Sequence, residues 1–230
     1  MPANIRQTDV WLSLGLALVG GYGDAASYEL AKSFTGHVTG NLVLGAIAVA
    51  ARDWRAMFGP LAAIITFLVG VVLSTAIVRL LKAWPSRALL FATMAIEVIL
   101  IVAAALLLAS HAAHGIEIFV IFVSLALGLQ NGAFRHVGGI SVHTTYLTGM
   151  ITSLISTEAE KYTARVQLPP SVAPPDPKID LLCGIWLAFV LGAGIGAAMI
   201  LRFKALGMLG AALLLLILIL RNSIPFKKGG

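Results

Sequence analysis

The sequence predicts an all-α integral membrane protein, and three observations support this fold class. The 230 residues are 59% hydrophobic with a mean hydropathy of +0.96, and only 11% are charged, which is too few for the surface of a soluble domain. Several apolar runs reach the roughly 20 residues that a helix needs to cross a bilayer. The alternation of about ten residues that marks a membrane barrel is missing. We therefore expect one helical transmembrane domain over residues 1–230.

Eight apolar runs follow one another along the chain. They lie at about 10–31, 39–51, 57–80, 88–109, 116–134, 145–156, 180–201 and 205–221. Six are long enough to span, and we expect the first to be an uncleaved span rather than a signal peptide. The runs at 39–51 and 145–156 are short, which is typical of half-crossing helices. Five prolines in LPPSVAPPDPK, residues 168–178, predict a stiff exposed loop.

The basic residues test how many runs cross the membrane. If only the six long runs cross, five of the sixteen Lys and Arg residues lie on one face and eleven on the other. The five are Lys32, Arg52, Arg55, Arg202 and Lys204. If all eight runs cross, the split is nine against seven, with nearly no bias. The positive-inside rule therefore favours six spans with both termini in the cytoplasm. No basic patch carries interleaved aromatic residues, so we expect no nucleic-acid partner.

Three stretches of the first half recur in the second half in the same order. They are GYGDAASY (21–28) with GLQNGAFR (128–135), TGNLVLGAI (39–47) with TGMITSLIS (148–156), and FLVGVVLSTAIVR (67–79) with FVLGAGIGAAMILR (189–202). Asp24 aligns with Asn131 at an offset of 107. This self-similarity predicts an internal duplication, with repeat 1 over 8–110 and repeat 2 over 115–222. Three full spans per half place the two copies in opposite directions, which makes an inverted repeat of the kind found in secondary transporters.

The short runs both open on Thr-Gly, at Thr39-Gly40-Asn41 and at Thr148-Gly149. A helix that begins inside the protein directs its free N–H groups and the positive end of its dipole at the interior. Two such ends that face each other would suit an anionic group such as a carboxylate. We therefore expect these five residues to line a binding site.

Two carboxylates lie within apolar runs and are candidates for proton or cation coupling. Glu97 lies nine residues into the fourth run, where a lone carboxylate costs about 3 kcal/mol to insert. Asp24 follows Gly20, Gly21 and Gly23, where we expect the first helix to open. The alternatives are a protonated Glu97 bonded to a neighbouring helix, and an Asp24 that caps a resumed helix.

Amides and closely spaced glycines in the apolar runs have simpler interpretations. Gln130 and Asn131 would either bind the solute or hold two helices together by hydrogen bonds. The pairs Gly36/Gly40, Gly128/Gly132 and Gly192/Gly196 predict close helix contacts. We expect no metal site and no cofactor, because no ligand cluster or phosphate-binding loop is recognisable.

The motifs also carry a family resemblance. GYGDAASY followed by TGHVTGNLVL, and then LGLQNGAFRHVGGISVHTTYLTGMITSL, resembles the YoaK family of bacterial inner-membrane proteins over nearly the whole chain. That family is one of unknown function, so the resemblance implies a fold and a multi-pass location in the bacterial inner membrane. It implies no substrate.

Together these observations predict a secondary transporter or facilitator of a small polar or anionic solute, driven by protons or cations. The lipid bilayer and the solute are the expected partners, and the oligomeric state is open, a homo-oligomer included. A channel-like pore remains an alternative, since facing half-helices also serve a pore. A membrane enzyme or an accessory subunit of a membrane complex is the other alternative.

Overall fold

The structure is a computed structural model that describes residues 6–134, 136–137, 140–141, 148–149, 151–152, 155–156, 159 and 177–223. Within these residues the regular secondary structure is helical apart from two strands of two residues each, and turns join the helices. The helices are α1 (Gln7–Ala31), α2 (Val38–Ala50), α3 (Trp54–Leu80), α4 (Ser86–Ala109), α5 (Gly115–Ala133), α7 (Pro177–Phe203), the 3₁₀ helix η1 (Lys204–Met208) and α8 (Leu209–Ser223). The strands β1 (His136–Val137) and β2 (Ile140–Ser141) pair antiparallel. The predicted all-helical class is confirmed; the Pro-rich segment 168–178 lies almost wholly outside the described residues.

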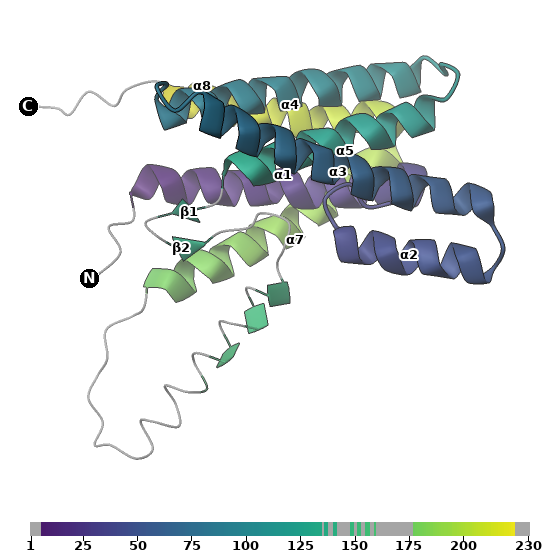
Figure 1. Ribbon diagram of the computed structural model, residues 1–230, viewed down its shortest axis with the longest axis horizontal. Coiled ribbons are helices and arrows are strands. Elements are labelled where there is room, and N and C mark those ends of the chain that lie inside the picture. Colours follow the sequence, from purple (N-terminus) through teal and green to yellow (C-terminus); the bar gives the residue numbers. More distant parts are fainter. Residues whose placement is uncertain are drawn as a thin grey trace, which may run out of the picture.

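Contacts between helix ends give the direction of each helix. Arg87 Nη2 at the start of α4 lies 2.9 Å from Asp9 Oδ1 at the start of α1. The guanidinium of Arg221, near the end of α8, lies 5.1 Å from the centre of the Trp11 ring. Helices α1 and α4 therefore begin, and α8 ends, at one end of the bundle, which we call the α1-start end. Short connections turn α3 into α4 and α4 into α5, so α3 and α5 run the opposite way (Figure 1).

Four stretches of the described chain are long and apolar enough to cross a membrane. They are Trp54–Leu80, Arg87–Ala109, Gly115–Ala133 and Ile179–Ser223. The last contains α7, η1 and α8, and Lys204 takes a positive φ of 54° where the chain folds back. The shorter apolar helix α2 has 13 residues, which span about 20 Å and are too few for a bilayer core of about 30 Å. These apolar stretches indicate a multi-pass helical membrane protein.

Helix α1 is continuous through its glycines, so the expected opening near Asp24 is wrong. It runs for 25 residues without a break. The glycines serve packing instead: a Cβ at Gly21 would overlap the carbonyl oxygen of Phe189 in α7. Glycine here lets two helix backbones approach closely.

Two tight helix crossings, α1 with α7 and α3 with α5, are built around glycines. A Cβ at Gly192 would overlap the carbonyl oxygen of Leu18 in α1. In the other crossing, a Cβ at Gly128 would overlap the carbonyl oxygen of Phe67, and one at Gly70 would overlap that of Leu125. The predicted role of Gly128/Gly132 and Gly192/Gly196 in close helix contacts is confirmed. Gly40 differs, because its neighbour is the Phe34 ring of the preceding turn.

The buried core lies between α1, α4, α5, α7, η1 and α8. Its largest fully buried apolar side chains include Tyr22, Phe119, Leu16, Met94, Ile101 and Met208. Helix α3 reaches this core through Ala63, and large apolar side chains of α2 and α3, such as Leu42, Val72 and Leu80, are exposed. Such outward apolar surface is what a lipid-facing helix requires.

Candidate functional site

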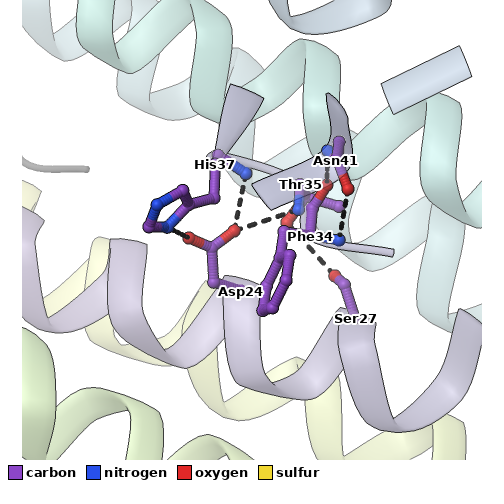
Figure 2. A network of polar contacts seen from close by, with 7 residues as sticks. Asp24, Ser27, Phe34, Thr35, His37 and Asn41 are labelled. Carbon is purple, nitrogen blue, oxygen red and sulfur yellow. Dashed lines mark hydrogen bonds and ion pairs between the residues drawn. The ribbon is translucent and has the colours of Figure 1, made fainter. Parts of the chain in front are cut away.

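The turn between α1 and α2 is fastened to α1 by a carboxylate. Asp24 is 3% exposed, and its Oδ1 accepts hydrogen bonds from the N–H groups of Thr35, at 3.0 Å, and Gly36, at 2.6 Å. Its Oδ2 lies 4.0 Å from Nδ1 of His37, the residue before α2. Figure 2 shows the Asp24 side chain rising from α1 into this turn. The hydroxyl groups of Ser27 and Thr35 add a second link, at 3.2 Å.

The position of this contact shows that the chain turns back into the bundle after α1. Asp24 precedes the end of α1 by seven residues, which corresponds to about 10 Å along the helix axis. The turn at Thr35 and Gly36 therefore lies about 10 Å inside the end of α1. Helix α2 begins at this depth and runs back toward the start of α3, which it packs against.

Asn41 holds the same turn from the other side. Its Oδ1 accepts a hydrogen bond from the Phe34 N–H at 2.9 Å, and its Nδ2 donates to the Phe34 carbonyl oxygen at 2.6 Å. The Phe34 ring stacks on Tyr28 of α1, with ring centres 4.9 Å apart. A buried loop needs partners for its backbone groups, and the two side chains Asp24 and Asn41 supply them. This explains why a short polar segment interrupts two apolar runs.

The loop that leads into α2 thus donates to a carboxylate, and this carboxylate is the protein's own. The N–H groups of Thr35 and Gly36 already donate to Asp24, so these two donors are engaged and do not serve an anionic solute. Thr39 is exposed and Gly40 is half-buried, so only Asn41 of this triplet is a buried member of the site. The geometry gives Asp24 and Asn41 a positioning role in the turn.

Gln130 and Asn131 lie near the end of α5 and make contacts between or within helices. Gln130 is buried, and its Nε2 donates to the carbonyl oxygen of Leu16 in α1 at 3.2 Å. Asn131 is half-buried, and its Nδ2 donates to the Leu127 carbonyl oxygen at 2.9 Å within α5. The contact of Gln130 agrees with the interpretation that this amide holds two helices together.

Glu97 lies in the middle of α4 and is fully buried, with 0% exposure. Within the described part of the chain, neither of its carboxylate oxygens has a hydrogen-bond partner. The hydroxyl group of Ser124, on the neighbouring helix α5, is also buried and has no hydrogen-bond partner within the described residues. An ionised carboxylate without partners is very costly in a low-dielectric interior. A group of this kind inside a membrane protein is a candidate for binding a proton or a cation.

Thr148 and Gly149 begin the second short run. Thr148 is exposed, Gly149 is half-buried, and the Thr148 carbonyl oxygen accepts a hydrogen bond from the Thr152 hydroxyl group at 2.9 Å. Most of the surrounding segment lies outside the described residues. The meeting of the two Thr-Gly segments in one pocket therefore stays a prediction.

Sequence reasoning missed two further polar contacts. The Tyr22 hydroxyl group donates to the carbonyl oxygen of Gly207, which ties α1 to η1. Asp9 and Arg87 join the starts of α1 and α4. Both contacts join residues more than 70 positions apart, and neither has a local motif that would reveal it. Among the described residues, no cluster of three or more His, Cys, Asp or Glu side chains could hold a metal ion.

Comparison with known proteins agrees with the membrane fold. A family model described as "Protein of unknown function (DUF1275)" matches residues 12–220. The chain is 31% identical over 143 residues to the UPF0700 transmembrane protein YoaK of Bacillus subtilis (strain 168). That alignment covers 61% of this chain and 63% of the relative, so it spans less than two thirds of the relative's length. No solved structure matches.

Proposed function

This chain belongs to the DUF1275 family of membrane proteins of unknown function, and from that premise we propose that it is a secondary transporter or facilitator of a small polar or anionic solute. In this proposal six segments cross the bacterial inner membrane: α1, α3, α4, α5, α7 and η1 with α8. Helix α2 and the second Thr-Gly segment enter from opposite faces without crossing. Both termini are cytoplasmic, so the α1-start end of the bundle is the cytoplasmic end.

The observation that carries this proposal is the equivalence of the two glycine crossings. Gly21 and Leu18 of α1 correspond to Gly128 and Leu125 of α5 at the offset of 107 that also relates Asp24 to Asn131. In the second alignment, Phe67 and Gly70 of α3 correspond to Phe189 and Gly192 of α7. Each glycine meets the carbonyl oxygen that the alignment assigns to its counterpart's partner. This match at the level of backbone contacts supports the proposed internal duplication.

The helix directions support an inverted relation between the halves. Helices α1, α3 and α4 alternate in direction from the α1-start end, whereas α5, α7 and α8 alternate from the opposite end. Inverted repeats with interrupted or half-crossing helices are a recurrent plan of secondary transporters, and their solute sites lie near the middle of the membrane. The inward start of α2 fits that plan.

In this proposal Glu97 binds the coupling proton or cation, and Asp24 supports the turn between α1 and α2. Glu97 is buried without a partner in the described chain, so a proton or cation gains most by binding there. Asp24 already accepts two backbone hydrogen bonds. The solute would bind between the two Thr-Gly segments, near Gly40, Asn41, Thr148 and Gly149, with Thr39 at the outer edge.

Uptake into proteoliposomes, measured with and without an imposed pH gradient, tests the proposal. Pooled radiolabelled small organic acids and polar metabolites serve as the first substrates, and active pools are then divided. We expect saturable uptake that a pH gradient accelerates in the wild type and no longer accelerates in Glu97→Gln. Glu117→Gln, on the exposed start of α5, is the matched control. Uptake that does not saturate and shows no counterflow would favour a pore and contradict the proposal.

A further inference from the structure

A cavity of about 580 Å³ opens at the α1-start end, away from the Asp24 turn. The start of α1, the end of α3, the start of α4 and the end of α5 form its walls. Its polar lining comes from Asp9, Thr75, Arg79 and Arg87, and apolar side chains such as Leu90 complete it. This volume is in the range of sites that hold small molecules.

The charges in this cavity do not balance. Arg87 is engaged, because its Nη2 lies 2.9 Å from both Asp9 Oδ1 and Thr8 Oγ1. No ion pair or hydrogen bond from the Arg79 side chain occurs in the described part of the chain. With Asp9 neutralised by Arg87, the residues that the structure describes around the cavity leave one positive charge uncompensated, at Arg79.

Two polar side chains of α3, Thr75 and Arg79, line this cavity, and the Thr75 hydroxyl group donates to the Val71 carbonyl oxygen at 2.7 Å. Thr75 and Arg79 are four residues apart and so lie on one face of α3, with Arg79 nearer the opening and Thr75 one turn deeper. An arginine also suits the carboxyl end of a helix. That preference accounts for a charge at the end of α3, but it does not account for a cavity beside the charge.

We propose that this cavity binds a small dissolved oxyanion, a carboxylate or a phosphate, through the guanidinium of Arg79. A guanidinium presents two parallel N–H donors that match the two oxygens of a carboxylate or phosphate. The apolar wall next to Leu90 and Phe134 accommodates the carbon body of an organic acid. This cavity is a second site, apart from the solute site proposed between the two Thr-Gly segments, so the inference goes beyond the proposed function. Binding itself requires no transport.

Isothermal titration of the purified protein in nanodiscs of phosphatidylcholine tests the proposal. The probes are butyrate, benzoate and inorganic phosphate, titrated as sodium salts against sodium chloride at equal ionic strength. We expect at least one probe to bind, and Arg79→Gln to weaken that binding about tenfold or more, the loss of a charge-assisted hydrogen bond. Arg202→Gln, at the opposite end of the bundle, is the matched control and binds as the wild type does. Because Arg79 is exposed and without a described partner, we expect the unfolding temperature of Arg79→Gln to equal that of the wild type.

Three outcomes would overturn the proposal. The first is the absence of binding by all three probes, and the second is equal affinity in Arg79→Gln and the wild type. The third is loss of binding when the nanodiscs contain phosphatidylglycerol, which would assign the site to a lipid headgroup instead of a dissolved solute. Oxyanion binding without any uptake would reject the proposed function alone.

Discussion

Asp24 is the residue whose replacement most directly tests the account of the turn. Asp24→Ala would leave the N–H groups of Thr35 and Gly36 buried without an acceptor. We expect a loss of about 2 to 3 kcal/mol in the free energy of unfolding, because each buried unsatisfied group is costly. Asp24→Asn, which copies the residue of the second half, retains an acceptor oxygen and should lose less. Thermal unfolding in detergent, followed by intrinsic fluorescence, measures both changes.

The control for Asp24 is Asp53, which accepts a hydrogen bond from the Ala56 N–H at 3.0 Å as the exposed N-cap of α3. Asp53→Ala should cost about 1 kcal/mol, the usual effect of losing an N-cap. Equal effects of the two substitutions would show that the buried network around Asp24 does not hold the turn.

Glu97 permits a separate prediction, because its structural and functional roles have opposite consequences for stability. Glu97→Gln removes a buried acidic group that has no described partner, so we expect the unfolding temperature to stay the same or to rise. A residue that held helices together would instead lower the unfolding temperature when its acid group is lost. Differential scanning fluorimetry of Glu97→Gln beside Glu117→Gln distinguishes the two roles.

At the scale of the elements, the crossing of α1 with α7 predicts that two glycines of α7 differ in the stability lost on substitution by alanine. Gly192→Ala would place a methyl group against the carbonyl oxygen of Leu18, which a rigid helix backbone cannot move aside. Gly194 lies two residues further along α7, and a Cβ there would meet nothing within 4 Å. We expect Gly192→Ala to lose about 1 to 3 kcal/mol by overpacking and Gly194→Ala to be neutral or slightly stabilising.

The same substitution at Gly70, which the proposed repeat aligns with Gly192, extends this test to the other crossing. A Cβ at Gly70 would overlap the carbonyl oxygen of Leu125, so Gly70→Ala should lose about as much stability as Gly192→Ala. Detergent unfolding of the three variants provides the comparison. A large loss in Gly192→Ala with none in Gly70→Ala would argue that the two crossings are not equivalent.

The helices could be predicted from the sequence where their composition alone determines them. The short second helix, expected over 39–51, is found at Val38–Ala50, because its apolar run is bounded by polar residues on both sides. The break expected near Asp24 is absent, because Gly21 serves a helix crossing that only the partner helix α7 makes visible. Glycine in an apolar run is compatible with both an opening and a close contact, and local sequence does not separate them.

The candidate site was predictable only in part, for a similar reason. The sequence indicated a polar turn and an inward helix start, and both follow from local patterns at Thr35–Asn41. It did not indicate that Asp24 itself would accept the loop N–H groups, since that contact depends on how far the chain returns into the bundle. The cavity beside Arg79 likewise depends on four helix ends that are distant in sequence.

At the scale of the whole molecule, the central claim is that α2 enters the membrane and returns to the face from which it came. Every other feature of the proposed inverted repeat depends on it, because a full crossing by α2 would reverse the relation of α1 to α3. The exposed positions Glu29, Ala51, Ala83 and Ala113 flank the relevant connections. The chain has one cysteine, the exposed Cys183, which is first replaced by serine.

Single cysteines at these four positions, labelled in intact cells with a membrane-impermeant maleimide, provide the most direct measurement. The account predicts that cysteines at 29, 51 and 113 react from outside the cell and that a cysteine at 83 reacts only after the membrane is made permeable. Labelling of position 29 from one face and of position 51 from the other would show that α2 crosses the membrane, and would contradict the inverted arrangement.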